Sequence, residues 1–158
     1  MRKQITGPLD NRHPEAGRAR CLDLEGLAKV EITSEDVAHP IESALTASSG
    51  TGWRAAQPGE QVIRLLFDEP QHLRSVHLVF DESEQPRTQE FWVRWSADRG
   101  VTYREVVRQQ FNFCPPTTIH EVEDYDVDLA GVTTLELRVV PDISHGDARA
   151  SLAMLRLA

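Results

Sequence analysis

Five residues that lie between the apolar runs of this sequence carry side chains suited to binding a polar ligand. Four of them can exchange hydrogen bonds with hydroxyl groups, namely His39, Arg54, Asn112 and His145. The fifth, Phe113, belongs to the segment Phe111–Pro116 and can stack on a flat ring. The same segment also suits two other roles, which are anchoring a protein partner and filling the end of a hydrophobic core. The residue types alone leave these three alternatives open.

A second group of residues is suited to contact with a macromolecule. Trp92 and Arg94 alternate with apolar residues along 89–95, so they point away from the core-facing side of that segment. Their face has three interpretations: it is covered by residues 1–26, it is covered by a second subunit in a homodimer, or it is an exposed interaction patch. In the last case Arg87, just before this segment, would meet acidic groups of the partner.

No motif for catalysis or for metal binding is present. The sequence lacks G-x-S-x-G, H-x-H, H-E-x-x-H and a phosphate-binding glycine run followed by lysine. Asp124, Asp126 and Asp128 have the spacing that opens an EF-hand loop, but Leu129 occupies the sixth position, where glycine is needed. Alternation along a strand explains the three aspartates better, as one solvated face. We therefore predict a protein that is not an enzyme and that binds no metal or cofactor.

Short apolar-rich runs separated by turn residues make up most of the chain after residue 26. They lack a sustained 3.6-residue period, which predicts strands in place of long helices. The expected strands are residues 27–33, 61–67, 73–80, 89–95, 103–107, 124–129, 134–140 and 150–157, with one helical turn at 41–45. This pattern predicts an all-β antiparallel β-sandwich or jelly roll of about eight strands, with Trp53 and Trp95 in its core. Residues 1–26 are polar, so we expect an N-terminal extension before a single domain of residues 27–158.

The lengths of the predicted connections place a binding site at one end of the sandwich. Successive antiparallel strands alternate in direction, so every second connection lies at the same end. The long connections, residues 34–60, 81–88, 110–119 and 141–149, all belong to one set, and the short ones belong to the other. Long loops on a rigid sheet commonly carry binding residues.

The composition limits the compartment and the partners. The chain has 158 residues, and its 17 Lys and Arg against 25 Asp and Glu give a net charge of −8, which disfavours nucleic acid as a partner. No apolar stretch approaches the ~20 residues of a membrane span, and the first residues lead into no apolar signal region. We therefore expect a cytoplasmic protein without a membrane contact. Cys21 and Cys114 are too few for a zinc site or a disulfide framework.

The order of several short elements resembles the galactose-binding-like, discoidin (coagulation factor 5/8 C) β-sandwich superfamily. The elements are Thr33-Ser34, Pro40–Leu45, Thr51-Gly52-Trp53, Glu69-Pro70, Leu73–Val79, Phe91–Gly100 and Ala150–Leu157. This resemblance covers about residues 28–157 and implies a galactose-binding-domain-like fold. Many members bind glycans or small ligands through loops, which implies a non-catalytic module that recognises a carbohydrate or a similar small polar ligand. The superfamily's structural calcium is held partly by a last-strand glutamate, for which this chain has Met154, a poor calcium ligand.

A narrower resemblance covers residues 33–60. They match, without a gap, the corresponding part of the N-terminal domain of the eukaryotic X-ray-repair cross-complementing scaffold proteins. The matching residues are Ser34, Asp36, His39, Glu42, Leu45, Trp53–Ala56 and Gly59-Glu60. This implies an alternative function, an intracellular scaffold domain that binds a protein partner or nucleic-acid ends, as in DNA single-strand-break repair. Arg54, Arg87 and the basic residues among 2–20 would then meet acidic groups, and Trp92 would anchor the partner.

Overall fold

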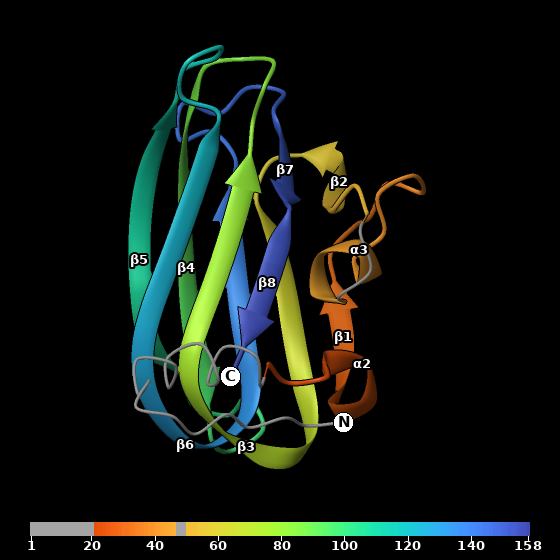
Figure 1. Ribbon diagram of the computed structural model, residues 1–158, viewed down its shortest axis with the longest axis vertical. Helices are drawn as coiled ribbons and strands as arrows, with labels where there is room; N and C mark the ends of the chain where they lie inside the picture. Colours follow the sequence, from red (N-terminus) through yellow and green to blue (C-terminus); the bar gives the residue numbers. More distant parts are fainter. Residues whose placement is uncertain (1–20, 47–49) are drawn as a thin grey trace, which may run out of the picture.

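The computed structural model describes residues 21–46 and 50–158, and it confirms the predicted all-β antiparallel sandwich (Figure 1). The elements are α2 (Leu24–Leu27), β1 (Ala28–Ile32), α3 (Glu42–Leu45), β2 (Trp53–Pro58), β3 (Gln61–Asp81), β4 (Arg87–Ser96), β5 (Arg104–Phe113), β6 (His120–Val140), β7 (Arg149–Leu152) and β8 (Met154–Leu157). One sheet has the order β1-β3-β6-β4-β5, with β8 paired to β3, and a separate two-stranded sheet pairs β2 with β7. No helix in the described residues is long and apolar enough to cross a membrane.

Two long strands, β3 and β6, run through both layers of the sandwich. Residues 63–67 of β3 pair with β1, residues 76–79 pair with β8, and β6 follows β3 along most of its length. The β3–β6 register shifts between Leu66 and Ser75, and Figure 1 shows both strands bending at that lower end. The predicted turn at 68–72 is therefore a bend within one strand. Pro70 fits there, because a proline without an N–H is tolerated where a ladder is irregular.

The predicted gathering of long connections at one end is confirmed for three of the four. Figure 1 shows the β3–β4, β5–β6 and β6–β7 connections together at the upper end of the sandwich, and the bends of β3 and β6 at the lower end. The long connection between β1 and β2 contains α3, which begins at Glu42 and confirms the predicted helical turn. A strand that was not predicted, β2, lies near the upper end and pairs with β7.

The core lies between the two layers and is aromatic at its centre. Phe80 of β3 and Phe91 of β4 are fully buried, with ring centroids 5.1 Å apart. Trp53 is 1% exposed, and its Nε1 donates a 3.0 Å hydrogen bond to the Ser34 carbonyl, which confirms the expected core position. Trp95 is only half-buried, because the β4–β5 register shifts after Val93 and leaves the ring at the margin of the core.

Part of the expected N-terminal extension packs on the sandwich. Residues 1–20 of the expected extension lie outside the described residues. In the part that is described, Leu24 is 3% exposed, and the Leu22 N–H donates to the Leu157 carbonyl at 2.7 Å. These two contacts were not predicted, because the segment as a whole is polar.

The aspartates that alternate along β6 form a solvated face, as predicted. Asp124, Asp126 and Asp128 are all exposed. Two of them are hydrogen-bonded across the ladder to histidines of β3, Asp124 to His77 and Asp128 to His72. Two of the three aspartates therefore form cross-strand pairs.

Candidate functional site

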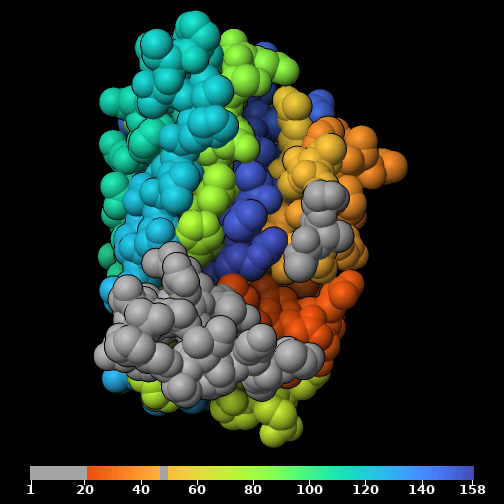
Figure 2. Space-filling model, viewed as in Figure 1, coloured from red at the N-terminus to blue at the C-terminus, as the bar shows by residue number. Residues whose placement is uncertain are grey.

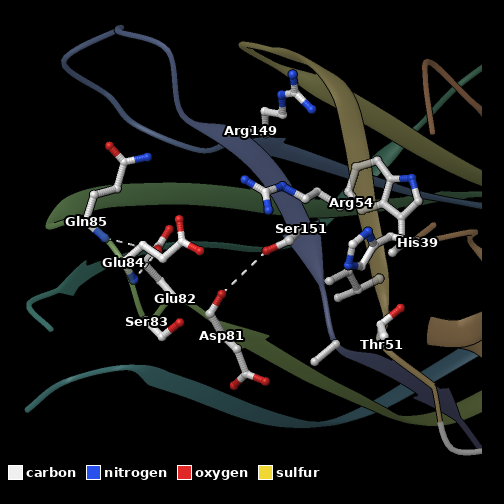
Figure 3. Close-up of a pocket in the computed structure, with 13 residues that line it drawn as sticks. His39, Thr51, Arg54, Asp81, Glu82, Ser83, Glu84, Gln85, Arg149 and Ser151 are labelled. Carbon is white, nitrogen blue, oxygen red and sulfur yellow. Dashed lines mark hydrogen bonds between the residues drawn. The ribbon is translucent and has the colours of Figure 1, made fainter. Parts of the chain in front are cut away.

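A cleft of about 170 Å³ opens beside the upper end of the sandwich. One side is the β2–β7 sheet, and the other is the end of β3 with the loop of residues 82–86 that follows it (Figure 3). Residues from the β1–β2 connection, His39 and Thr51, also line it. Four segments distant in the sequence therefore meet at this cleft, because the antiparallel pairing brings their ends together.

The β2–β7 side of the cleft carries hydrogen-bond donors. Arg54 of β2 lies opposite Ser151 of β7 in the ladder, and Arg149 lines the same side. In the described part of the chain, no carboxylate lies within 4.0 Å of either guanidinium group. Both arginines are therefore available to a ligand, and Figure 3 shows the Arg54 side chain extended across β7.

His39 is tied to Arg54 through the backbone. The Arg54 N–H donates to the His39 carbonyl at 3.2 Å, and the Asp36 N–H donates to the Arg54 carbonyl at 2.8 Å. The Nδ1 atom of His39 is buried and has no hydrogen-bond partner, with the Asp36 carboxylate 3.8 Å away. A buried polar atom without a partner is uncommon and points to a ligand or a bridging water.

The opposite side of the cleft carries acceptors, and Glu82 fixes its shape. One Glu82 oxygen accepts a 2.6 Å hydrogen bond from Arg87 Nε, and the other accepts from the N–H groups of Glu84 and Gln85. Burial alone would raise the pKa of Glu82, but these hydrogen bonds together hold it below its ordinary value. Glu84 then presents an exposed carboxylate to the cleft. The carboxylate of Asp81 is hydrogen-bonded to His120 Nδ1 at 2.6 Å, so Asp81 faces the cleft with its backbone carbonyl, which accepts a hydrogen bond from the Ser151 hydroxyl at 3.5 Å (Figure 3).

The structure brings together two of the five predicted ligand-binding residues, His39 and Arg54. His145 is exposed in the β6–β7 loop with a φ of 68°, and it does not line the cleft. Asn112 is exposed on β5, where its side-chain oxygen accepts a 2.7 Å hydrogen bond from the Thr88 hydroxyl. Neither residue lies with the other two.

The predicted stacking role of Phe113 is wrong. The ring is 2% exposed, and the guanidinium of Arg87 lies 4.8 Å above its centroid. Phe111 packs against it edge-on, with the ring centroids 5.0 Å apart. Phe113 therefore fills the end of the core, which is one of the alternatives that the sequence left open.

Arg87, predicted to belong to an interaction patch, is an interior residue. It is 5% exposed and donates to the Glu82 carboxylate, the Gln89 side chain and the Pro141 carbonyl. A buried guanidinium needs acceptors for its N–H groups, and these three provide them. Arg87 therefore ties the β3–β4 loop to the end of β6 and is not available to a partner.

The other two residues of the predicted patch lie on the outer face of the sheet. Arg94 donates to Glu136 and stacks 4.0 Å from the centre of the Tyr103 ring. Trp92 is half-buried, with Arg108 at 4.6 Å and Arg138 at 5.8 Å from its ring. The role of Trp92 and Arg94 in binding stays a prediction.

Sequence reasoning missed most of the residues that line the cleft, among them the polar residues Glu84, Arg149 and Ser151. They lie in or beside the connections that the strand-direction argument placed at one end. The missing information was the pairing of β2 with β7, which sets Ser151 against Arg54. Within residues 21–46 and 50–158, no group of three or more His, Cys, Asp or Glu residues is arranged to hold a metal ion.

Comparison with known proteins identifies the fold by structure alone. No protein-family model and no curated protein matches this sequence. The family 32 carbohydrate-binding module of Clostridium perfringens NanJ, solved with galactose, is 11% identical with a TM-score of 0.63, over 87% of this chain and 96% of that one. A family 32 module from a C. perfringens family 31 glycoside hydrolase is 18% identical with a TM-score of 0.63, over 90% and 96% of the two chains.

An F5/8 type C domain gives the same result. The domain from a Bacteroides fragilis protein is 12% identical with a TM-score of 0.59, over 87% of this chain and 93% of that one. These identities are low, so the likeness concerns the path of the backbone and not the site residues. The chain has the galactose-binding-like, discoidin β-sandwich fold that these modules share.

Proposed function

We propose that this protein is a non-catalytic carbohydrate-binding module and that the sugar binds in the cleft between β7 and the β3–β4 loop. The proposal rests mainly on one observation: Arg54 and Arg149, donors that have no carboxylate partner in the described residues, line the cleft opposite the exposed acceptor Glu84 (Figure 3). A sugar hydroxyl both donates and accepts hydrogen bonds, so it needs both kinds of group. Neighbouring folds were solved with galactose, with GalNAc-β-1,3-galactose and with 4,5-unsaturated mannuronic acid, which supports this class of ligand.

Hydrogen bonds, and not stacking, would provide most of the recognition. The one aromatic residue among those that line the cleft, Trp53, is 1% exposed and uses its N–H within the protein. Arg54 would donate to one or two ring hydroxyls, and Ser151 would exchange a hydrogen bond beside it. Glu84 would accept from a hydroxyl on the other side. Because no apolar ring is offered, we expect modest affinity and a strong dependence on individual polar side chains.

Replacing Arg54 with alanine should weaken sugar binding at least about tenfold, since hydrogen bonds from charged groups contribute about 1.5–3 kcal/mol. Binding of galactose, N-acetylgalactosamine and galacturonic acid would be measured by calorimetry after a glycan array has identified the best of them. The matched control is Arg104→Ala, which removes an exposed arginine from β5, outside the cleft. An unchanged affinity in Arg54→Ala, with the control also unchanged, would remove the cleft from the proposal.

The scaffold function implied by residues 33–60 stays a prediction, and a salt titration separates it from sugar binding. Contacts with nucleic-acid phosphates release counterions and weaken steeply as salt rises, whereas hydroxyl recognition does not. The assay would compare a nicked DNA duplex and the best array sugar at two salt concentrations. Salt-insensitive, saturable sugar binding supports the module. Salt-dependent duplex binding without any sugar binding contradicts it.

A further inference from the structure

The described residues leave the core of the sandwich partly uncovered beside β1. Ala28, Val30 and Ile32 point inward from this strand, yet they are only half-buried. The inward residues of the neighbouring strand, such as Ile63 and Leu65, are 1% exposed. The difference arises because β1 is the edge strand of its sheet and is flanked by the short helices α2 and α3 (Figure 1).

This uncovered region forms a pocket of about 400 Å³ with an apolar floor. Its apolar lining is Leu24, Ala28, Val30, Ile32, Ile41 and Leu45. In Figure 2 the segments that contribute these residues form the orange part of the surface, on the right of the molecule. The pocket shares no lining residue with the proposed sugar cleft. Its volume is in the range of pockets that take small ligands or a few side chains.

Among the described residues, the polar lining of this pocket is acidic apart from one threonine. Glu25, Glu35 and Glu42 line it, and no lysine, arginine or histidine of residues 21–46 and 50–158 does. One Glu35 oxygen accepts a 2.8 Å hydrogen bond from the Ile41 N–H, at the start of α3. Within the described residues, no cationic side chain forms an ion pair with any of the three glutamates. Three carboxylates around an apolar surface favour an occupant that is both apolar and positively charged.

Arg156 contacts α3 beside this pocket, but it forms no ion pair with the glutamates. Its guanidinium donates to the carbonyls of Ala44 at 2.9 Å and Thr46 at 2.7 Å, at the end of α3. It therefore holds α3 in place and leaves the glutamates without a counter-charge. The negative charge of the pocket is a feature of the folded domain and is not cancelled from within its described part.

The free edge of β1 indicates that the occupant is a polypeptide. In the described residues β1 pairs with β3 on one side, and its other edge has no strand partner. An extended segment can hydrogen-bond to such an edge while alternate side chains enter a neighbouring pocket. We propose that the β1 pocket binds an extended segment of a partner protein, in which one or two large apolar side chains are flanked by lysine or arginine.

The test uses two capped synthetic peptides and the full chain. One peptide has two leucines flanked by lysines, and the other has the same leucines flanked by glutamates. Each is titrated into ¹⁵N-labelled protein while amide chemical shifts are recorded. We expect the lysine peptide to shift the signals of Val30, Ile32 and Leu45, and the glutamate peptide to leave them unchanged. Shifts confined to other residues, or equal binding of both peptides, would overturn the proposal.

Charge variants test the acidic lining directly. Glu25→Gln combined with Glu42→Gln should weaken binding of the lysine peptide by about two- to tenfold, the range expected for two partly exposed ion pairs. The matched control, Asp68→Asn with Glu69→Gln, removes the same charge at the bend of β3 and should change nothing. If both double variants weaken binding of the lysine peptide equally, the effect comes from the net charge of the protein. That result would contradict binding at the β1 pocket.

Hexylammonium, added alone, separates a peptide site from a small-molecule site. Binding as tight as that of the lysine peptide would assign the pocket to small amphiphilic cations and overturn the partner-protein proposal. Weaker binding supports the role of the β1 edge. Because the sugar cleft lies on other residues, loss of peptide binding in Glu25→Gln/Glu42→Gln with sugar binding intact distinguishes this proposal from the proposed function.

Discussion

Replacing Glu121 with glutamine should stabilise the protein, and the gain should increase as the pH rises from 4.5 to about 8. Glu121 is fully buried between the layers, where its Oε1 accepts a 3.0 Å hydrogen bond from Gln89. Burial in the first place, and the neighbouring carboxyl group of Glu123 in the second, raise its pKa to about 8. Glutamine keeps the acceptor for Gln89 and removes the group that resists ionisation.

The sign of the pH effect follows from proton binding. Between pH 4.5 and about pH 8, the folded protein keeps a proton on Glu121 that the unfolded chain has lost. The free energy of unfolding therefore decreases as the pH rises through this window, and the full contribution is present only below it. Glu121→Gln lacks this decrease. We expect it to be more stable than the natural protein by at least about 1 kcal/mol at pH 8, or about 2–4 °C in Tm.

Thermal unfolding of both proteins at several pH values measures this difference. The control is Glu105→Gln, which removes an exposed glutamate of β5. Since all other titrating groups are common to the proteins compared, the difference between the Glu121 variant and the natural chain isolates Glu121. A constant difference across the window, or a variant less stable than the natural protein at pH 8, would show that Glu121 is ionised at no cost.

Local alternation was sufficient to predict the strands that bury one face. In 89–95 the spacing of Phe91 and Val93 identified β4 and its inward side, because side chains of a strand point alternately to its two faces. The same rule made the aspartates of β6 a solvated row. Strand direction then placed the long connections at one end without knowledge of any pairing. These inferences depend only on residues that are close together in the sequence, so they need no knowledge of the strand pairing.

Partnerships between distant segments were not predictable in the same way. The run 150–157 reads as one strand, but it changes partner at Ala153, from β2 to β3, because the Ala153 N–H donates to the Val79 carbonyl. Phe113 has the same sequence pattern whether it fills the core or faces a ligand. The sequence predicts that Arg87 is a surface cation. Only its hydrogen bonds to Glu82, Gln89 and Pro141 show that it is buried. The cleft depends on such pairings, so only its His39 and Arg54 were anticipated.

Among the residues on the outer face of the sheet, Glu136 should be the one whose replacement lowers the free energy of unfolding most. It is fully buried on β6, and its two oxygens accept hydrogen bonds from Arg64, Arg94 and Arg138 on three adjacent strands. Burial alone would raise the pKa of Glu136, but these three arginines together hold it below its ordinary value. The carboxylate thus compensates three guanidinium groups that lie close together, and its removal leaves them mutually repulsive.

Glu136→Gln should therefore destabilise the protein by about 2–3 kcal/mol at neutral pH, the range for breaking a buried charge cluster whose cations keep some contact with water. Urea unfolding followed by tryptophan fluorescence measures this change. Glu90→Gln is the control, because Glu90 pairs with Arg108 at the surface, and an exposed pair contributes at most about 1 kcal/mol.

The pH dependence gives this prediction a second and independent test. A lowered folded-state pKa means that the stabilisation by Glu136 is complete above 4.5 and is lost as the pH falls toward the lowered value. The difference in free energy of unfolding between the natural protein and Glu136→Gln should accordingly become smaller below pH 4.5. The sign is opposite to that of the Glu121 effect, because there the variant is the more stable protein. A loss of stability equal to that of Glu90→Gln, or one that does not become smaller in acid, would contradict this prediction. It would mean that the arginines stabilise the sheet through their aliphatic stems and their stacking on Tyr103 and Trp92, without this carboxylate.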